Sequence, residues 1–231
     1  MKACSTTLAV CWVVFAVPTY PQAGDRPADE KKAAIAEIQK AGGEVVVDTT
    51  DPANVVTKVY LGDTKISDAA LTHLTKLDNV TELVLAGTKI TDKGLEQLKG
   101  LTNLRKLNLN DTEVSDKGLE HLKGLTNLHD LYLGRLSKVT GKGLAHLKGM
   151  KDLQDLILTE TGVTEEGLEY LKGLTKLQRL YLGGLPITDK GLENLSNLTG
   201  LRTLGLDGTK VSAEGVKKLK EKLPNLKVAG K

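Results

Sequence analysis

The stretch "LRKLNLNDTEVSDKGLEHLKGLTN", residues 104–127, decides the fold, because nearly the same letters stand before it and after it. Within each copy, apolar residues occupy positions 1, 4, 6, 11, 16, 19 and 22, and successive copies begin 24 or 25 residues apart. The copies begin at Val56, Val80, Leu104, Leu128, Leu153, Leu177 and Leu201, and a partial copy begins at Leu226. A chain built from one repeated unit is expected to form a stack of similar layers.

Each copy combines two periodicities. The segment "LRKLNL" (104–109) alternates polar and apolar residues as a half-buried strand does, whereas "GLEHLKGL" (118–125) places leucines three apart, as one face of a short helix would. One copy buries too little apolar surface to offset its loss of conformational entropy, whereas stacked copies share a continuous core. We therefore predict a solenoid whose strands pair into a parallel sheet.

Several recurring small or polar residues are interpreted as structural. A Ser or Thr before each helix is expected to cap its free N–H groups, and a glycine in the first helical turn is expected for its small size, because the first copy has Ala70 there. A Thr after the strand is expected to satisfy backbone groups of adjacent copies. The capping residues are Ser67, Thr91, Ser115, Thr140, Thr164, Thr188 and Ser212; the glycines are Gly94, Gly118, Gly143, Gly167, Gly191 and Gly215; the threonines are Thr64, Thr88, Thr112, Thr161 and Thr209.

The two ends and the fourth copy depart from the pattern. Residues 24–55 are predicted to form a linker and an N-terminal cap of helix plus strand, 56–225 the seven repeats, and 226–231 a C-terminal cap strand. The fourth copy has one extra residue between Leu133 and Val139. We interpret it as a tolerated bulge at a bend, with a functional irregularity as the alternative.

Residues 1–23 have the pattern of a signal peptide, with Lys2, an apolar run over 8–17 and then two prolines. The run is too short to span a bilayer, although an uncleaved anchor is the alternative. Both cysteines, Cys4 and Cys11, lie in this leader, so the mature chain would have no disulfide and no thiolate metal site. We expect an exported protein, secreted, periplasmic or associated with the cell envelope, with no transmembrane span in the mature chain.

The charge balance excludes one class of partner. The chain has 32 Lys and Arg against 29 Asp and Glu, a formal net charge of only +3. A nucleic-acid-binding protein would be expected to carry a strongly basic surface. Neither nucleic acid nor an anionic membrane is indicated as a partner.

The copies resemble leucine-rich repeats, because "LRKLNL", "LQRLYL" and "LHDLYL" match the LxxLxL strand of that family. Continuations such as "VSDKGLEHL" are similar to its cysteine-containing subclass, with Thr here in place of Cys. The resemblance implies an α/β, right-handed leucine-rich-repeat solenoid with a parallel β-sheet on the concave face and short helices on the convex face. That subclass includes eukaryotic ubiquitin-ligase adaptors with an F-box, for which residues 24–55 are too short; the other resemblance is to exported bacterial leucine-rich-repeat proteins, which implies protein binding.

Only the outward strand positions vary freely between copies, so they are the candidate binding surface. Position 5 contains Tyr60, Tyr132 and Tyr181, three of the four tyrosines that follow the leader, in one column expected to be exposed. Tyrosine is enriched in binding hot spots, although it also suits any exposed sheet. Charged residues surround this column: Asp130, Asp155 and Arg179 at position 3, Arg135 at position 8, and Arg105, His129 and Arg202 at position 2. Opposite charges on neighbouring strands are expected to form surface ion pairs.

Catalysis and metal binding have little support in the sequence. Asp130 and Asp155 fall on neighbouring strands and are the one candidate carboxylate pair, but Lys106 and Arg179 flank them. Three histidines, His73, His121 and His146, share a helix column whose helices are expected to lie too far apart for joint metal ligation. We expect no enzyme, no metal and no cofactor. The favoured function is a scaffold that binds a protein on its concave face; the alternative is a structural or envelope module without a dedicated partner there.

Overall fold

The computed structural model describes residues 26–50 and 55–230, so the predicted signal peptide, residues 1–23, lies outside the described part of the chain. The elements follow one another in a regular alternation of strand and helix. In chain order they are α1 (Arg26–Lys40), β1 (Glu44–Asp48), β2 (Val55–Tyr60), the 3₁₀ helix η1 (Asp68–Lys76), β3 (Glu82–Val84), α2 (Asp92–Glu96), η2 (Gln97–Gly100), β4 (Lys106–Asn108), α3 (Asp116–Glu120), β5 (Asp130–Tyr132), α4 (Gly141–Leu144), η3 (Ala145–Gly149), β6 (Asp155–Ile157), η4 (Glu165–Leu171), β7 (Arg179–Tyr181), α5 (Asp189–Glu193), β8 (Thr203–Gly205), α6 (Ala213–Lys222) and β9 (Lys227–Ala229).

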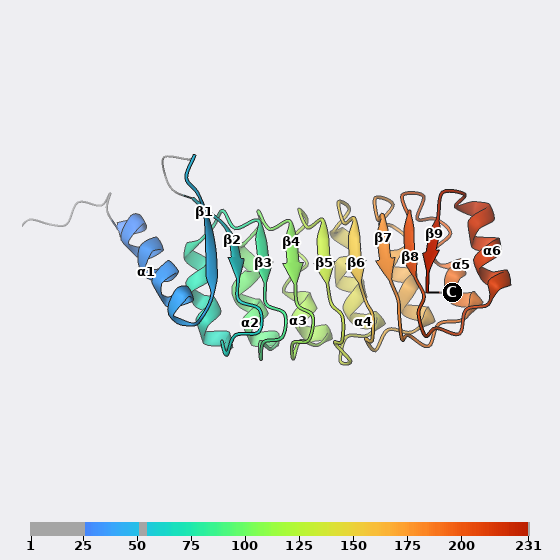
Figure 1. Ribbon diagram of the computed structural model, residues 1–231, viewed down its shortest axis with the longest axis horizontal. Coiled ribbons are helices and arrows are strands. Elements are labelled where there is room, and N and C mark those ends of the chain that lie inside the picture. The colour runs from blue at the N-terminus through green and yellow to red at the C-terminus, as the bar shows by residue number, and fades with distance from the viewer. Residues whose placement is uncertain (1–25, 51–54, 231) are drawn as a thin grey trace, which may run out of the picture.

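The strands of the described residues form one sheet in the order of the sequence, β1 to β9 (Figure 1). From β2 to β9 every neighbour is parallel, and equivalent positions pair, as Leu83 with Leu107 and Leu107 with Leu131. The predicted parallel sheet is therefore confirmed. Strand β1 differs, because it pairs antiparallel with β2. Strand β1 ends at Asp48 and β2 begins at Val55, and so short a connection permits antiparallel pairing, whereas parallel strands need a longer crossover.

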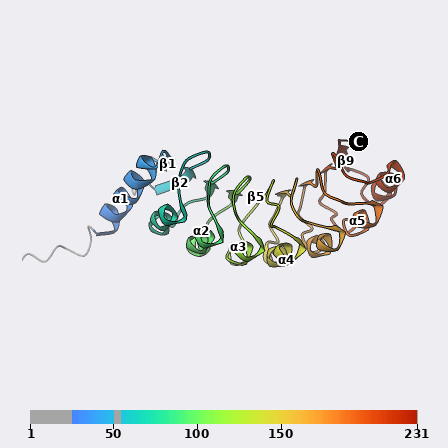
Figure 2. The same ribbon diagram turned by 90° about the horizontal axis from the view of Figure 1, so that it is seen from below.

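The solenoid is curved, with the sheet on the inner side of the arc and the helices on the outer side (Figure 2). The cause is geometric: neighbouring strands lie about 4.8 Å apart, whereas packed helices need roughly 8–10 Å between their axes. The outer side is therefore longer than the inner one. This matches the predicted α/β solenoid with a concave sheet and convex helices.

The core is the aliphatic interior between the two sides. In the copy that opens at Leu104, all seven apolar positions are at most 1% exposed. Its buried residues are Leu104, Leu107, Leu109, Val114, Leu119, Leu122 and Leu125. The same positions are buried in the neighbouring copies and join into one continuous cluster. Stability therefore depends on packing between copies rather than within one.

The N-terminal helix α1 covers the first repeat. Its residues Ala34 and Ile38 are buried in the common core, and Glu30 forms an ion pair with Lys76 at 2.8 Å. None of the helices in residues 26–50 and 55–230 combines the length and apolar content needed to cross a membrane.

The extra residue of the fourth copy is absorbed at a bend. Leu136 is buried there while Ser137 and Lys138 are exposed. Strands β5 and β6 still pair without a shift, from Asp130 with Asp155 to Tyr132 with Ile157. The structure agrees with a tolerated bulge.

The predicted caps form at four of the seven helix starts. Thr91, Ser115 and Thr140 accept hydrogen bonds from the N–H two residues on, and Ser212 accepts one from Gly215. The prediction is wrong for Ser67, Thr164 and Thr188, whose side chains make no capping bond.

Most of these hydroxyls also bind an acid of the preceding copy. Asp116 accepts hydrogen bonds from the Thr140 N–H and hydroxyl, both at 2.6 Å, and from the Gly143 N–H at 3.0 Å. Equivalent pairs are Asp68 with Thr91, Asp92 with Ser115, Glu165 with Thr188 and Asp189 with Ser212. We call this series the carboxylate ladder. It joins each helix start to the next, using charge-assisted bonds that are stronger than neutral ones.

The ladder is interrupted once, where Gly141 occupies the place of the acid. The Thr164 hydroxyl instead donates to Glu166 of its own copy at 2.7 Å. The two backbones come very close there, since a Cβ built on Gly141 would lie 2.6 Å from the Cα of Gly167. Direct backbone contact replaces the carboxylate between these two copies.

The recurring helix glycines are needed for their size, as predicted. A Cβ on Gly118 would lie 2.5 Å from Oδ1 of Asp92 and 3.0 Å from the side chain of Val114. None of these glycines has a positive φ. The carboxylate of the preceding copy therefore fills the space that a side chain would need.

The prediction for the threonines after the strand is wrong in one respect. Their hydroxyls donate to a leucine carbonyl three residues earlier in the same copy, as Thr88 does to Leu85 at 2.6 Å, and not to an adjacent copy. The remaining members are Thr64, Thr112, Thr161 and Thr209. A bend places the hydroxyl nearest to its own strand, so the bond stabilises the turn locally.

Candidate functional site

The concave face is built from the strand residues whose side chains point away from the core. In β4 the central Leu107 is buried while Lys106 and Asn108 on either side are half-buried. The parallel register repeats this arrangement from strand to strand. Equivalent positions therefore form columns across the strands, as the sequence predicts.

The tyrosine column lies on this face, but its members are less exposed than predicted. Tyr60, Tyr132 and Tyr181 are all half-buried. The ring of Tyr181 covers Gly205 on the next strand, where a Cβ would lie 2.6 Å from Cδ1. Burial, followed by the charge of Asp130, raises the pKa of Tyr132. Close packing on flanking side chains explains the difference, because a column neighbour lies only about 4.8 Å away.

Side chains at position 3 of the concave face form a row of ion pairs between neighbouring strands. Glu82 lies between Lys58, at 3.3 Å, and Lys106, at 3.1 Å. Burial would raise the pKa of Glu82, but hydrogen bonds from Lys106 and Lys58 and their charges outweigh it and leave the pKa below its ordinary value. Lys106 also lies over the ring of Tyr132, 5.7 Å from its centroid. The predicted pairing of opposite charges is confirmed.

The same row of position 3 side chains brings Asp130 and Asp155 side by side on β5 and β6. Asp155 is only 4% exposed and is bound by Arg179, so the prediction of a surface pair is wrong for this residue: the neighbouring side chains cover the carboxylate. Burial, together with repulsion from Asp155, raises the pKa of Asp130. Arg179 therefore neutralises Asp155 rather than Asp130, so the negative charge of Asp130 is the less favourable of the two.

Replacing Asp130 with asparagine is expected to stabilise the fold at neutral pH. A raised folded-state pKa means that the protonated carboxyl contributes stability below its ordinary pKa and that this contribution is lost as pH rises through the folded-state pKa. Above that range the charge of Asp130 is unfavourable, and the variant removes it. The gain should be below about 1 kcal/mol, because solvent screens this partly exposed group.

Urea unfolding of both proteins at pH 3, 5 and 7 measures this effect. The difference in the free energy of unfolding should be largest at pH 7 and vanish toward pH 3. A difference that is independent of pH, or a less stable variant at pH 7, would show that Asp130 is not destabilised by its neighbours.

At the ends of the strands, position 8 forms a charged rim. Arg135 binds Asp111 at 2.9 Å and Glu160 at 3.5 Å, which links three consecutive copies. All three residues have positive φ, between 57° and 62°, a conformation that is unfavourable for residues other than glycine. The side chains at this rim are therefore held at a backbone position where other copies, such as the one with Gly87, use glycine.

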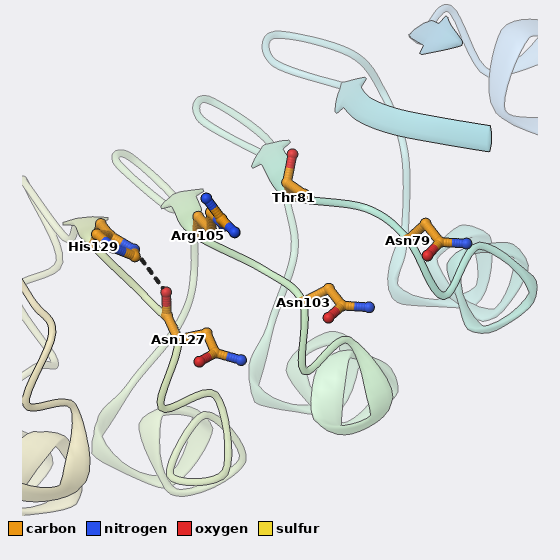
Figure 3. Close-up of a pocket in the computed structure, with 6 residues that line it drawn as sticks. All are labelled: Asn79, Thr81, Asn103, Arg105, Asn127 and His129. Carbon is orange, nitrogen blue, oxygen red and sulfur yellow. Dashed lines mark hydrogen bonds between the residues drawn. The ribbon is translucent and has the colours of Figure 1, made fainter. Parts of the chain in front are cut away.

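At the beginnings of the strands, the structure has a polar hollow of about 380 Å³ (Figure 3). Arg105 and His129 lie side by side there, just before β4 and β5. The backbone N–H of His129 donates to the backbone carbonyl oxygen of Arg105 at 2.7 Å. The imidazole Nδ1 lies 2.8 Å from the carbonyl oxygen of Asn127. The lining residues are Asn79, Thr81, Asn103, Arg105, Asn127 and His129.

The predicted site residues therefore fall into groups. Asp130, Tyr132, Asp155, Arg179 and Tyr181 lie together on β5, β6 and β7. Arg105 and His129 share the hollow, and Arg135 lies at the opposite rim. Tyr60 lies on β2, and Arg202 precedes β8 and donates to the carbonyl oxygens of Thr199 and Leu201. The predicted residues therefore share one side of the sheet, but they do not form one compact site.

In the described ranges, no group of three or more His, Cys, Asp and Glu side chains is placed to hold a metal ion. Of the three helix histidines, His146 lies on η3 and His73 on η1, in different copies of the stack. The cysteines lie outside the described residues.

The asparagines of the hollow were missed in the sequence. Asn103 donates its amide N–H to the backbone carbonyl of Asp78 at 3.0 Å, and Asn127 donates to that of Thr102 at 2.8 Å. The available signal was their spacing, because Asn79, Asn103 and Asn127 stand at one repeat position in consecutive copies. The apolar repeat pattern does not distinguish these positions, because they lie in the bend before each strand.

Known proteins show the same architecture. A family model described as a leucine-rich repeat matches residues 79–99 and 100–123. The solved structure of an internalin C2 from Listeria monocytogenes is 26% identical, with a TM-score of 0.65 over 84% of this chain and 81% of that one. An internalin F structure from the same species is 24% identical, with a TM-score of 0.61 over 87% of this chain but only 61% of that one, so this chain spans less than two thirds of its length. No curated protein matches the chain in sequence.

Proposed function

Since this chain is a leucine-rich-repeat solenoid, we propose that it is an exported, non-catalytic scaffold that binds another protein on its concave sheet. The observation that carries the proposal is the column of Tyr60, Tyr132 and Tyr181, half-buried on one face and surrounded by charges. Rigid, half-buried tyrosines offer contact area and a hydroxyl at a low cost in side-chain entropy. Residues 1–23, with their signal-peptide pattern, support export.

The acid pair supports the absence of catalysis in this proposal. A general acid and base need two groups free to exchange protons with a substrate. Asp155 is instead bound to Arg179 and is 4% exposed. The other carboxyl, Asp130, interacts with Asp155, so the two groups do not act independently.

A structural module without a dedicated partner is the second candidate. The ion pairs from Lys58 through Glu82 to Lys106 favour it, because these charges satisfy one another and leave less for a ligand. Such pairs are found on many exposed sheets and contribute little stability.

The combined variant Tyr60→Ser, Tyr132→Ser, Tyr181→Ser is expected to lose a partner that the unchanged chain captures from source cells and their surroundings. Removing three aromatic anchors should weaken binding by at least about 100-fold, since each hot-spot residue contributes over about 1 kcal/mol. The measurement is affinity capture, followed by titration of the captured protein.

The matched control is Tyr170→Ser. Tyr170 is equally half-buried but lies on helix η4, on the convex side, where Lys148 lies 4.6 Å from its ring centroid. It should retain the partner. Capture by the folded triple variant would move the binding site away from the concave face, and loss by the Tyr170 variant would move it to the helices.

A further inference from the structure

The polar hollow at the strand beginnings contains a cation that no side chain of the described residues neutralises. Arg105 is exposed and forms no ion pair with any residue in 26–50 or 55–230. Two other arginines on the concave side form ion pairs: Arg135 with Asp111 and Glu160, and Arg179 with Asp155. The third, Arg202, donates to the backbone carbonyl oxygens of Thr199 and Leu201. Among the described residues, the guanidinium of Arg105 has neither kind of partner, so it is available to an outside anion.

The remaining lining groups are mostly acceptors. Asn103 and Asn127 use their amide N–H groups on backbone carbonyls of the preceding copy, which fixes the two amides. Within the described residues, no hydrogen bond reaches the amide oxygens. The Asn127 carbonyl accepts from His129 Nδ1 at 2.8 Å, so a neutral imidazole carries its proton there and offers Nε2 as an acceptor.

This combination matches an acidic side chain on an extended peptide. A carboxylate pairs with a guanidinium through two parallel hydrogen bonds. The peptide N–H groups beside that side chain need acceptors, and the fixed oxygens of Asn103 and Asn127 supply them. A phosphate group would bring more negative charge and no N–H donors for the oxygens of Asn103 and Asn127.

We propose that the hollow lined by Arg105, His129, Asn103 and Asn127 receives an aspartate or glutamate side chain of the protein partner, held in an extended segment across β3, β4 and β5. The inference rests on the proposed concave-face function and names the chemistry of that partner. The carboxylate lies against Arg105, and the adjoining backbone donates to the asparagines.

The test uses a blocked hexapeptide of alternating Gly and Glu as the probe, titrated into the isotope-labelled full chain and followed by NMR. The side-chain signals of Arg105 and His129 should shift saturably, and the same peptide with Gln in place of Glu should leave them unchanged. Arg105→Gln should weaken binding by about tenfold, because it removes a charge-assisted pair.

Lys142→Gln is the control, because Lys142 is an exposed cation on helix α4, on the convex side, and does not line the hollow. It should bind within about twofold of the unchanged chain, given the distance from the hollow. Equal binding of the Glu and Gln peptides, no saturable shift, or equal losses in both variants would overturn the inference. Backbone spectra establish that each variant is folded.

Failure of this inference can be told apart from failure of the proposed function. A partner lost by the triple tyrosine variant but kept by Arg105→Gln would leave concave-face binding standing and remove the acidic contact. A partner kept by the triple tyrosine variant would contradict the proposed function, whatever the peptide does.

Discussion

Replacing Gly143 with alanine is expected to lower the free energy of unfolding by about 3 kcal/mol. The added methyl group would overlap Oδ1 of Asp116 and lie 3.0 Å from Leu119. Asp116 would have to move, although it accepts three hydrogen bonds from the next copy, two from Thr140 and one from Gly143 itself. Bonds to a charged acceptor contribute about 1.5–3 kcal/mol, and partly broken ones leave buried groups unsatisfied.

Thermal and urea unfolding would measure this loss, which corresponds to roughly 6–12 °C in melting temperature for a chain of this size. Gly124→Ala is the matched control, since nothing lies within 4 Å of a Cβ built there. That change should be neutral or stabilise by up to ~1 kcal/mol, because alanine restricts the unfolded chain. Similar stabilities for the two variants would show that the close approach at Gly143 does not constrain the stack.

Replacing Gly141 with aspartate should also destabilise the protein, although the repeat pattern suggests the opposite. Aspartate stands at this position in four other copies, at Asp68, Asp92, Asp116 and Asp189, and would appear to complete the carboxylate ladder toward Thr164. A side chain here would meet the backbone of Gly167, with its Cβ 2.6 Å from Cα and 3.3 Å from the amide nitrogen. Backbone atoms cannot rotate away, so we expect a loss of more than about 3 kcal/mol.

Glu165→Asp is the control for this prediction, because it changes the length of a ladder acid where the space exists. Glu165 binds the Thr188 hydroxyl at 2.7 Å, and an aspartate is expected to change stability by less than ~1 kcal/mol. Urea unfolding distinguishes the two variants. A Gly141→Asp protein more stable than the unchanged chain would mean that the fourth and fifth copies separate easily enough to admit the carboxylate.

The fold could be predicted because it depends on spacing within one copy. The leucine positions of residues 104–127 identify a strand and a helix, and their recurrence identifies the stack. The carboxylate ladder could not be predicted in the same way. Asp92 and Ser115 stand 23 residues apart, and only the stacking of one helix start on the next brings them together. The sequence therefore indicated a capping role for the hydroxyl of Ser115, but not the acid of the preceding copy that binds it.

For the candidate site, the sequence predicted which residues share a column on the concave face, but not how deeply each side chain is buried. The alternation in the strands placed Tyr132 and Asp155 on the concave face. It did not show that Asp155 is 4% exposed, because that depends on how Arg179 and the flanking strands lie over it. Nor did it indicate the hollow, because its asparagines stand in the bends, where the apolar pattern makes no prediction. The burial of Asp155 and the hollow both depend on residues that are neighbours in space but not in sequence.

The regular parallel sheet also makes the concave face a ruler. Strands recur every ~4.8 Å, whereas side chains on one side of an extended partner recur every ~6.8 Å. The two scales nearly coincide after three strands and four partner residues, at ~14.4 and ~13.6 Å. Tyr60 and Tyr132 stand on β2 and β5, three strands apart. A partner bound across the sheet as we propose would be in step with both tyrosines only at a four-residue interval, so the surface would select the periodicity of its ligand as well as its composition.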